Sequence, residues 1–444
     1  MFVKTYQWQD PIKIAHTLSE QEQDMAFLYS SKKYPYSGDH SFLAWGIDKE
    51  TTNIKDLEKF LKTPSNDPYE NFWLGYLGYE SLSKSNTTQK TNNLPKLFFF
   101  KPKNLLVFDH KKFSVNYYSK TTKTSQNSKT DSLLSNTYNP SKQPSCYNKL
   151  GKAGDTHRLT KIKSNMRKEE YIKKVEEIRK SIIEGDYYQA NLTRKFYGEI
   201  SVQNPFEIFH SLSLISPAPY SAYIKFRGNH ILSSSPERFI KIDKDGNINA
   251  RPIKGTINRS SDNGEDANIN ILRNSTKDRA ENLMIVDLMR NDLGKSANSV
   301  NLDKLFHIDS FATLHHMSSS INASKKPDIS NLSAVTNAFP PGSMTGTPKI
   351  AAIKALEKLE EYDRGVYSGC LGYFAGNQSC DLSVVIRTII ISPQAQNKPH
   401  KFEFQVGGAI IYDSDPQKEW QETLIKAKGI CQALNLNPST LASL

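Results

Sequence analysis

Apolar and polar residues alternate along most of the first 120 positions. The alternation is clearest in four runs broken by Gly, Pro and Asn: FLYSSKKYPYSGDHSFLAW, WLGYLGYES, KLFFF and NLLVFDHKKFSVNYYS. A period of two places successive side chains on opposite faces of a strand, as in a sheet with one buried face. This region is therefore predicted to consist mostly of antiparallel strands and turns.

The pattern changes after residue 166, where helical spacing begins. In residues 168–185, apolar side chains recur at spacings of four, three and four from Tyr171 to Ile182. Gly185 stands where a helix often ends in a left-handed residue. The segment is predicted to form an amphipathic helix with one buried face.

Strand and helix patterns then follow one another without regular βαβ order. A hairpin with a Gly-Asn turn is predicted within 220–242, helices around 280–293, 349–361 and 416–434, and strands in LSVVIRTIIIS and KFEFQVGGAIIY. Strand runs interrupted irregularly by helices favour an α+β architecture with large antiparallel sheets.

Positive charge is concentrated in one segment. The 444-residue chain has a formal net charge of +12, and residues 120–163 hold nine basic and two acidic side chains, a surplus of 9 − 2 = +7. This segment is rich in Ser, Thr, Asn and Lys without an apolar period, as flexible insertions are. A nucleic-acid-binding protein, the alternative suggested by the charge, is disfavoured because no basic strand interleaved with aromatic residues is present. We expect an N-terminal region 1–120, a linker or insertion 121–165 and a C-terminal region 166–437.

The sequence shows no sign of a membrane or secreted protein. No run approaches the roughly 18 apolar residues of a membrane span, and the N-terminus lacks the layout of a secretory signal. The four cysteines, Cys146, Cys370, Cys380 and Cys431, are widely spaced and contain no CxxC pair. Neither a disulfide framework nor a zinc site is indicated. We expect a cytoplasmic protein in a reducing compartment.

Two predicted helices carry carboxylates that could bind a divalent cation. Glu419 and Glu422 lie three residues apart near the start of the last helix, after the predicted N-cap Asp415. Acidic residues in a first turn also stabilise the helix dipole, which is the simpler explanation for this pair. Glu281, however, begins the unusually apolar helix ENLMIVDLMRND. One carboxylate or more on each of two helices suits the sparse oxygen site that Mg²⁺ accepts.

Three further segments have both a structural and a chemical interpretation. FPPGSMTGTPK leads into a helix with Thr347 as predicted N-cap, which favours either a bound anion or simply a capped helix. Lys254 in RPIKGT is flanked by apolar and small residues; if desolvated, its amine is a usable nucleophile, although most lysines are exposed cations. Cys370 in SGCLGY lacks the partners of a glutamine amidotransferase cysteine and is expected to be a buried small residue.

Together these segments resemble the chorismate-utilising enzymes, and among them the large subunits of aminodeoxychorismate synthases. The motifs follow the family's order across 166–434: GDYYQANLTRKF, SSSPERFIKI, RPIKGT, KDRAENLMIVDLMRNDLGK, LHHMSSSI, FPPGSMTGTPK, VYSGCLGYF, CDLSVVIRT and GGAIIYDSDPQKEWQET. The resemblance implies an α+β sandwich of two large antiparallel sheets with helices outside, built from both halves of the chain. The N-terminal runs are similar to segments that hold tryptophan in related enzymes, which implies a possible tryptophan pocket at Ser30, Tyr36, Ser37, Pro219 and Tyr220.

Two positions distinguish the branches of this family. Members that add water to chorismate carry a lysine base where this chain has Gln189, so the isochorismate and salicylate synthase branches are disfavoured. Anthranilate synthases have alanine in PIAGT where this chain has Lys254, and a lysine there is typical of aminodeoxychorismate synthases. The resemblance therefore favours aminodeoxychorismate synthase, with anthranilate synthase component I as the alternative.

The resemblance also implies a role for each motif residue. Lys254 would attack the chorismate ring, Glu237 would protonate the departing hydroxyl, and His316 would orient Glu237. The residues that would hold the substrate are Gly255, Thr256, Tyr373, Arg387, Gly407 and Gly408. The carboxylates that would hold Mg²⁺ on the substrate's ring carboxylate are Glu281, Glu419 and Glu422.

The implied reaction converts chorismate and ammonia to 4-amino-4-deoxychorismate, a precursor of para-aminobenzoate and folate, through a covalent lysine intermediate. Nothing in the sequence supplies the Cys-His-Glu group of a glutaminase. We therefore expect ammonia to come from a separate glutamine amidotransferase subunit, and the chain alone to use free ammonium.

Overall fold

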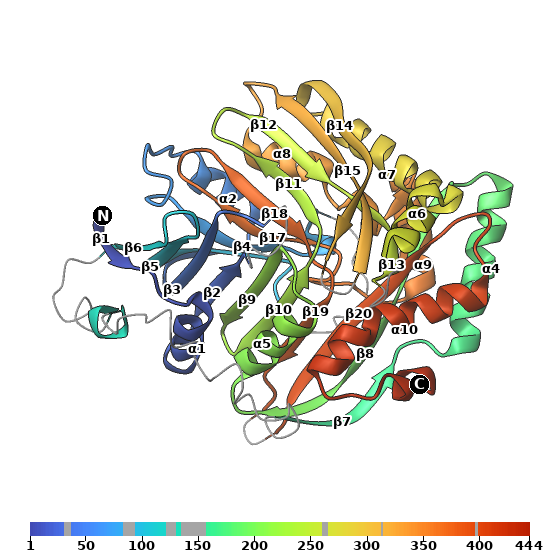
Figure 1. Ribbon diagram of the computed structural model, residues 1–444, viewed down its shortest axis with the longest axis horizontal. Coiled ribbons are helices and arrows are strands. Elements are labelled where there is room, and N and C mark those ends of the chain that lie inside the picture. The colour runs from blue at the N-terminus through green and yellow to red at the C-terminus, as the bar shows by residue number, and fades with distance from the viewer. Residues whose placement is uncertain are drawn as a thin grey trace.

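The computed structural model describes residues 1–30, 37–82, 94–120, 130–134, 157–259, 265–311, 314–395 and 398–444. Its strands form one hydrogen-bonded network of 20 strands over these residues, in which the pairs are antiparallel. Figure 1 shows this network folded into two layers, with helices on the outside. The α+β sandwich of antiparallel sheets predicted from the sequence is confirmed.

The first layer runs through strands from the N-terminal, middle and C-terminal parts of the chain. Its hydrogen-bonded order is β1 (Phe2–Gln7), β6 (Ser114–Ser119), β5 (Leu97–Asp109), β3 (His40–Thr51), β2 (Met25–Tyr29), β9 (Tyr220–Phe226), β10 (Asn229–Ser235), β19 (Thr388–Ser392), β20 (His400–Ile410) and β8 (Gln189–Val202). Strand β8 also pairs with β7 (His157–Ser164) and the short β16 (Gly346–Thr347).

The second layer begins on the same long β5 strand. Its order is β5, β4 (Trp73–Leu77), β17 (Cys370–Phe374), β18 (Cys380–Val384), β11 (Arg238–Ile242), β12 (Asn247–Arg251), β15 (Leu314–Lys325) and β14 (Ala297–Ser310). Strand β13 (Ile253–Asn258) continues from β12 and pairs with the first half of β15. Because N-terminal β2 and β4 pair with C-terminal β9 and β17, both halves of the chain build both layers.

Apolar side chains from both layers fill the space between them. This interior cluster includes Phe42 of β3, Tyr76 of β4, Phe98 of β5, Ile224 of β9 and Leu371 of β17. Alternation along each strand sends the opposite side chains outward, where the helices cover them. The alternation seen in the sequence therefore marks both the sandwich interior and the sheet faces under the helices.

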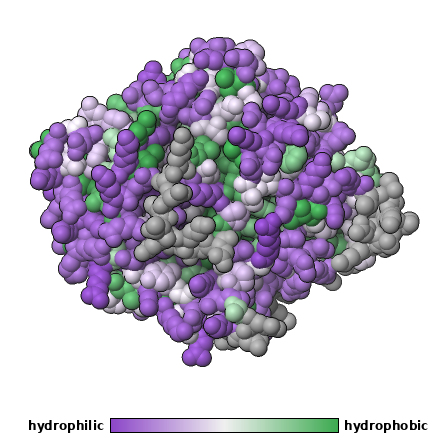
Figure 2. Space-filling view, turned by 180° about the vertical axis from the view of Figure 1, so that it is seen from behind, coloured by the Kyte–Doolittle hydropathy of each residue, from purple (hydrophilic) through white to green (hydrophobic). Residues whose placement is uncertain are grey.

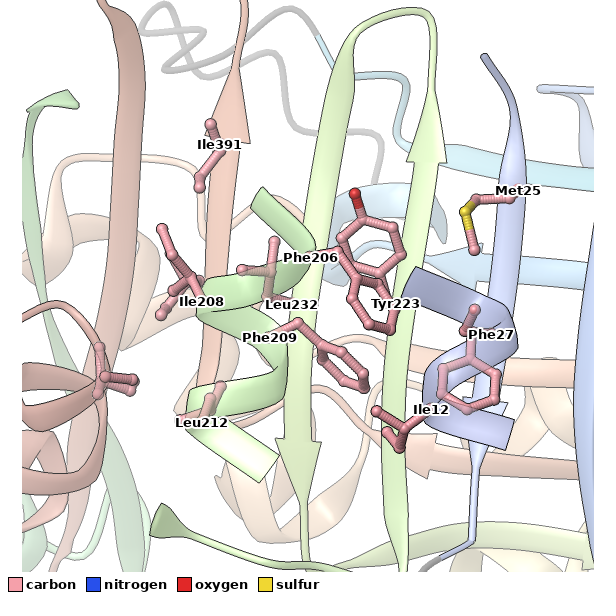
Figure 3. Packing of buried hydrophobic residues seen from close by; sticks show 14 of the residues in the cluster. Ile12, Met25, Phe27, Phe206, Ile208, Phe209, Leu212, Tyr223, Leu232 and Ile391 are labelled. Carbon is pink, nitrogen blue, oxygen red and sulfur yellow. The ribbon is translucent and has the colours of Figure 1, made fainter. Parts of the chain in front are cut away.

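Three helices cover the outer face of the first layer. They are α1 (Pro11–Gln21), α5 (Pro205–Ile215) and α10 (Pro416–Ala433). Figure 3 shows Phe206 and Phe209 of α5 beside the ring of Tyr223 on β9, and Leu212 of α5 and Leu232 of β10 belong to the same buried cluster. Asn204 caps α5 by accepting a hydrogen bond from the Phe206 amide at 3.0 Å. Further helices are α2 (Ile54–Leu61), α4 (Lys168–Glu184), α6 (Glu265–Asn274), α7 (Thr276–Gly294), α8 (Asn331–Ala338), α9 (Lys349–Glu360), α11 (Pro438–Ala442) and the 3₁₀ turns η1 (Tyr79–Leu82) and η3 (Gly342–Met344).

Several local predictions are confirmed. Helix α4 ends at Gly185, whose φ of 86° gives the left-handed C-cap. Asp415 caps α10 through the amides of Gln417 and Lys418, both at 2.9 Å. Cys370 is fully buried.

Other local predictions are wrong. The β9–β10 hairpin turns at Arg227 and Gly228, with φ of 48° and 73°, rather than at Gly-Asn. Two consecutive left-handed residues match the right-handed twist of the strands, which sets the turn one residue earlier. Thr347 lies in β16, and Pro348 is the residue before α9, so Thr347 does not cap that helix. The run LSVVIRTIIIS forms two strands, β18 and β19, because Arg387 between them adopts a φ of 51°.

The basic segment contains structured parts. His157–Ser164 form β7, which pairs with β8, and residues 130–134 are helical. Leu134 is 3% exposed and belongs to the core under α1 and α5. The expectation of a flexible insertion is therefore wrong for residues 130–134 and for β7, whose apolar side chains were hidden by the average composition of the segment.

The surface carries mostly polar residues. Figure 2 shows hydrophilic side chains over most of the face behind the view of Figure 1, with hydrophobic residues scattered among them. Within the described ranges, no helix combines the length and the apolar character needed to cross a membrane.

Candidate functional site

Most of the sequence-predicted site residues converge where the two layers meet helices α7 and α10. Helix α7 packs on β13, the strand with the RPIKGT motif, and α10 packs on β20, the strand that contains Gly407 and Gly408 (Figure 1). The connections that lead into β11 and β19 contribute Glu237 and Arg387. The site thus draws on elements spread over more than 180 residues of sequence, from Glu237 to Glu422.

Lys254 lies on a bulge of β13. Ile253 pairs with Ser318 and Thr256 with His316, so three steps along β13 match two along β15. The extra residue on β13 changes the direction of the Lys254 side chain, as β-bulges beside functional sites often do. Gly255 adopts a φ of +88°, and a Cβ there would lie 3.0 Å from Cβ of Asp278 on α7. Only glycine therefore allows both this conformation and this close approach of β13 to α7.

The amine of Lys254 is surrounded by charged groups. Burial lowers the pKa of Lys254, and the carboxylates of Glu281 and Glu237 oppose this shift. Lys426 lowers the pKa further. The net shift is downward, which raises the fraction of neutral amine, the form that acts as a nucleophile.

The three glutamates proposed as metal ligands lie on α7 and α10. Glu281 is 8% and Glu419 is 2% exposed, and burial raises the pKa of each carboxyl. Ser414 donates a hydrogen bond to Glu419 Oε1 at 2.7 Å. Glu422 is half-buried, and the neighbouring ammonium of Lys426 is the largest cause of its lowered pKa.

Two lysines that sequence reasoning missed lie against these carboxylates. Lys277 Nζ is 3.8 Å from Glu281 Oε1 and 3.4 Å from Glu419 Oε1. Lys426 Nζ is 2.6 Å from Glu422 Oε1 and donates to the Gly407 carbonyl at 2.9 Å. In the sequence, the only sign of these contacts is the i,i+4 spacing of Lys277 from Glu281 and of Lys426 from Glu422. Ordinary surface ion pairs on helices have the same spacing.

The donor set is chemically suited to a hard cation. Buried Glu419 Oε2 has no hydrogen-bond partner among the described residues. A Cβ on Gly408 would lie 3.1 Å from that oxygen and 3.4 Å from Glu422 Oε1, so the bare strand backbone borders both carboxylates. Mg²⁺ prefers such oxygen ligands. In this conformation, however, the described residues include no group of three or more His, Cys, Asp or Glu side chains arranged around a common metal position.

Thr256, His316 and Arg387 form a connected chain across the site. Thr256 Oγ1 and His316 Nδ1 are 2.7 Å apart, and His316 Nε2 is 3.4 Å from Arg387 Nη2. Burial, and secondarily the Arg387 charge, lowers the pKa of His316 well below its usual value, so its imidazole is neutral. Burial also lowers the pKa of Arg387 to about 10, which leaves it a cation near neutral pH.

Glu237 is the carboxyl with the most unusual acidity in the site. Burial raises its pKa from 4.5 to about 7, while a hydrogen bond with Ser343 and the charge of Lys254 oppose the shift. Ser343 belongs to η3, within the FPPGSMTGTPK segment. That segment therefore contributes a side chain to Glu237; an anion at the start of α9 stays a prediction.

Tyr373 is not brought to Arg387. Its ring packs on Phe42 and Phe72, with centroids 5.0 and 4.9 Å apart. Tyr373 pairs with Asp381 at the far end of β17 and β18, whereas the Ser368 amide donates to the Val385 carbonyl at 2.9 Å near Arg387. The tyrosine level with Arg387 is therefore the neighbour of Ser368, Tyr367. The structure therefore does not bring the predicted substrate-binding residues Tyr373 and Arg387 together, because sequence distance alone did not fix the strand register.

The predicted tryptophan pocket draws on residues that follow β2 and on the start of β9. Tyr29 pairs with Ser221, which places Ser30 beside Tyr220. The buried hydroxyls of Ser37 and Tyr220 have no hydrogen-bond partner in the described part of the chain. The Arg238 guanidinium lies 5.3 Å from the Tyr220 ring centroid, and Pro219 is buried. Tyr36 lies outside the described residues.

The cysteines that the structure describes are buried and unreactive. Cys370, Cys380 and Cys431 are free thiols, and burial raises the pKa of each. A nucleophilic cysteine needs an accessible thiolate with a lowered pKa. None of these three has that character.

Comparisons with known proteins identify the family to which the chain belongs. A model of the chorismate binding enzyme family matches residues 13–432, and the chain belongs to this family of enzymes. It is 44% identical to the aminodeoxychorismate synthase of Streptomyces pristinaespiralis over 60% of this chain and 36% of that protein. It is 34% identical to the chloroplastic aminodeoxychorismate synthase of Arabidopsis thaliana over 94% of this chain and 45% of that protein.

A solved structure supports the same architecture. Anthranilate synthase component I from Streptococcus pneumoniae is similar with a TM-score of 0.72 and 26% identity, over 88% of this chain and 92% of that chain. The present chain spans less than half the length of the two aminodeoxychorismate synthases.

Proposed function

We propose that the chain is an aminodeoxychorismate synthase large subunit, which converts chorismate and ammonia to 4-amino-4-deoxychorismate and water. The observation that carries the proposal is Lys254 on the β13 bulge, with a lowered pKa and under the influence of the Glu281 and Glu237 charges. Relatives of that name, 34–44% identical, support it. Gln189 supports the proposal as well. It occupies the position at which members of the family that add water to chorismate carry a lysine base.

Lys254 acts as the nucleophile in this proposal. Its neutral amine forms a C–N bond at the ring carbon two positions from the hydroxyl, the double bond shifts, and the C–O bond breaks. Glu237 in its protonated form gives its proton to the departing hydroxyl, which leaves as water. Ammonia then bonds to the carbon that held the hydroxyl, the double bond shifts back, and the lysine amine is released.

The proposed substrate has two carboxylates joined to a ring. The site offers positive charge for the carboxylates and exposed backbone beside the ring. Arg387 takes one carboxylate, since a guanidinium pairs with two oxygens at once. Thr256 and the backbone of Gly255, Gly407 and Gly408 border the ring. Glu281, Glu419 and Glu422 would hold Mg²⁺, which when bound would anchor and polarise the ring carboxylate.

Glu237 gives the proposal a defined pH dependence. A carboxyl with a pKa of about 7 is protonated below that pH and can then donate its proton. When total ammonium is adjusted so that the concentration of free NH₃ stays constant, kcat/KM should fall as the pH rises through about 7. Glu237→Gln cannot donate a proton and should lower kcat by about a hundredfold or more and remove this limb of the profile. Glu199→Gln, at an exposed pair with Lys161, is the control. A variant that keeps the limb would exclude Glu237 as the acid.

The ammonia is proposed to come from a glutamine amidotransferase partner. The three described cysteines are buried thiols with raised pKa, and the sequence has no matching Cys-His-Glu group. The purified chain should therefore use ammonium but not glutamine, and glutamine should serve only when an amidotransferase subunit is added. Glutamine turnover by the chain alone would contradict the partner proposal. Three free thiols also fit a cytoplasmic location.

The decisive experiment is a product assay with chorismate, Mg²⁺ and ammonium. Formation of 4-amino-4-deoxychorismate without pyruvate release supports the proposal. A fluorescent aromatic product with stoichiometric pyruvate would instead indicate anthranilate synthase, the activity in the name of the similar Streptococcus pneumoniae structure.

The division of the chain into regions and a second binding site are also part of the proposal. We propose that 1–120 and 166–437 act together to bind tryptophan at Ser30, Ser37, Pro219 and Tyr220, with 121–165 inserted between them. The unpartnered hydroxyls of Ser37 and Tyr220 support a polar ligand there. A calorimetric titration with tryptophan tests the pocket.

A further inference from the structure

Each candidate metal ligand is close to a lysine ammonium group. Lys277 on α7 reaches both Glu281 on its own helix and Glu419 on α10, at 3.8 and 3.4 Å. Lys426 lies against Glu422 at 2.6 Å. The two lysines therefore supply positive charge where three carboxylates would otherwise repel one another.

Lys277 differs from an ordinary surface ion pair in two ways. Its ammonium contacts carboxylates on two different helices, Glu281 on α7 and Glu419 on α10. Glu419 is only 2% exposed. The Lys277 side chain itself is 48% exposed, so the ammonium can move into solvent without unpacking the core. Burial lowers its pKa, but the carboxylates of Glu419 and Glu281 outweigh this and keep it a cation.

We propose that Lys277 is an internal counter-cation of the metal site, whose ammonium bridges Glu281 and Glu419 in the metal-free chain and must leave them when Mg²⁺ binds. This inference rests on the metal assignment in the proposed function. It gives the lysine in KDRAEN a role distinct from nucleophile, acid and substrate ligand. Mg²⁺ then binds in competition with a group of the protein itself, which weakens its apparent affinity.

Direct metal binding tests the competition. In calorimetric titrations with MgCl₂ alone, at fixed pH and low ionic strength, Lys277→Met should bind Mg²⁺ about threefold or more tightly than the parent chain. Lys277→Arg keeps the charge and should stay within about twofold of the parent. Lys180→Met removes an exposed i,i+4 pair with Glu184 on α4 and should change nothing.

A second readout follows from the metal-free state. Without Lys277 the carboxylates lose their counter-charge, so the rise in melting temperature on adding Mg²⁺ should be larger for Lys277→Met than for the parent. Glu419→Gln, titrated in parallel, reports the metal assignment itself. If Glu419→Gln weakens binding while Lys277→Met leaves it unchanged or weaker, the counter-cation is overturned and the metal site stands. If Glu419→Gln leaves binding unchanged, both are overturned.

Discussion

Lys254→Ala is expected to lower the rate of 4-amino-4-deoxychorismate formation at least about tenfold while the fold is kept. The loss of covalent catalysis costs more than about 1.4 kcal/mol of transition-state stabilisation, which corresponds to that factor. The side chain is only partly buried and lies on a bulge rather than in a packed core, so its removal leaves no large cavity. The measurement is single-turnover product formation with chorismate, Mg²⁺ and ammonium.

Two further observations make this test specific. Lys254→Met keeps the volume and the apolar stem but has no amine, so it should be as slow as the alanine variant. Lys241→Ala, an exposed lysine on β11, is the matched control and should retain the parent rate. Mass spectrometry of the parent chain incubated with chorismate without ammonia should show an adduct on Lys254 that both variants lack. A Lys254→Met variant with the parent rate would remove the nucleophile from the mechanism.

The sequence predicted much of the sheet structure and the helices α4, α7, α9 and α10 because their patterns are local. It did not predict α1, α2, α5, α6, α8 and α11. The amphipathic period of α4 and the cap of α10 by Asp415 depend only on neighbouring residues. The order of strands within the layers is not local, since β5 joins both layers and β4 pairs with a strand almost 300 residues away. That order was not predicted: the family resemblance implied only two large antiparallel sheets built from both halves of the chain.

Errors arose where a local signal was ambiguous. Arg227 takes a left-handed conformation that residue type does not suggest, and it moved the hairpin turn. Leu134 is a single buried apolar position in a segment whose average composition is that of a flexible chain. In both cases tertiary packing or strand twist decided the outcome.

The candidate site was predictable in its motifs but not in its electrostatics. Lys254, Glu281 and Glu419 are recognisable from sequence, whereas Lys277 and Lys426 look like solvent-exposed i,i+4 partners until α7 and α10 are placed face to face. The structure separates Tyr373 from Arg387. The motif VYSGCLGYF contains two tyrosines, and only the strand register shows that Tyr367 is the one level with Arg387.

Glu281→Gln should raise the Mg²⁺ concentration needed for half-maximal activity by about tenfold or more. A neutral amide replaces one of the few anionic oxygens that the site offers to the metal, and Mg²⁺ depends on such ligands. Stability should be kept, because the buried Glu281 carboxyl already has a raised pKa and glutamine has the shape of its protonated form. The Glu281 carboxylate, buried in the native state, lowers the free energy of unfolding increasingly as the pH rises above the pKa of this group in the unfolded chain. Glutamine carries no such charge.

The control is Glu177→Gln, which breaks an exposed i,i+4 pair with Lys173 on α4 and should leave the Mg²⁺ dependence unchanged. Mg²⁺-induced melting shifts give a readout independent of turnover, and they should shrink for Glu281→Gln but not for the control. An unchanged Mg²⁺ dependence in Glu281→Gln and in Glu422→Gln would mean that the metal is held elsewhere. The acidic residues of α10 would then be partners of the helix dipole, the simpler interpretation of their position in its first turns.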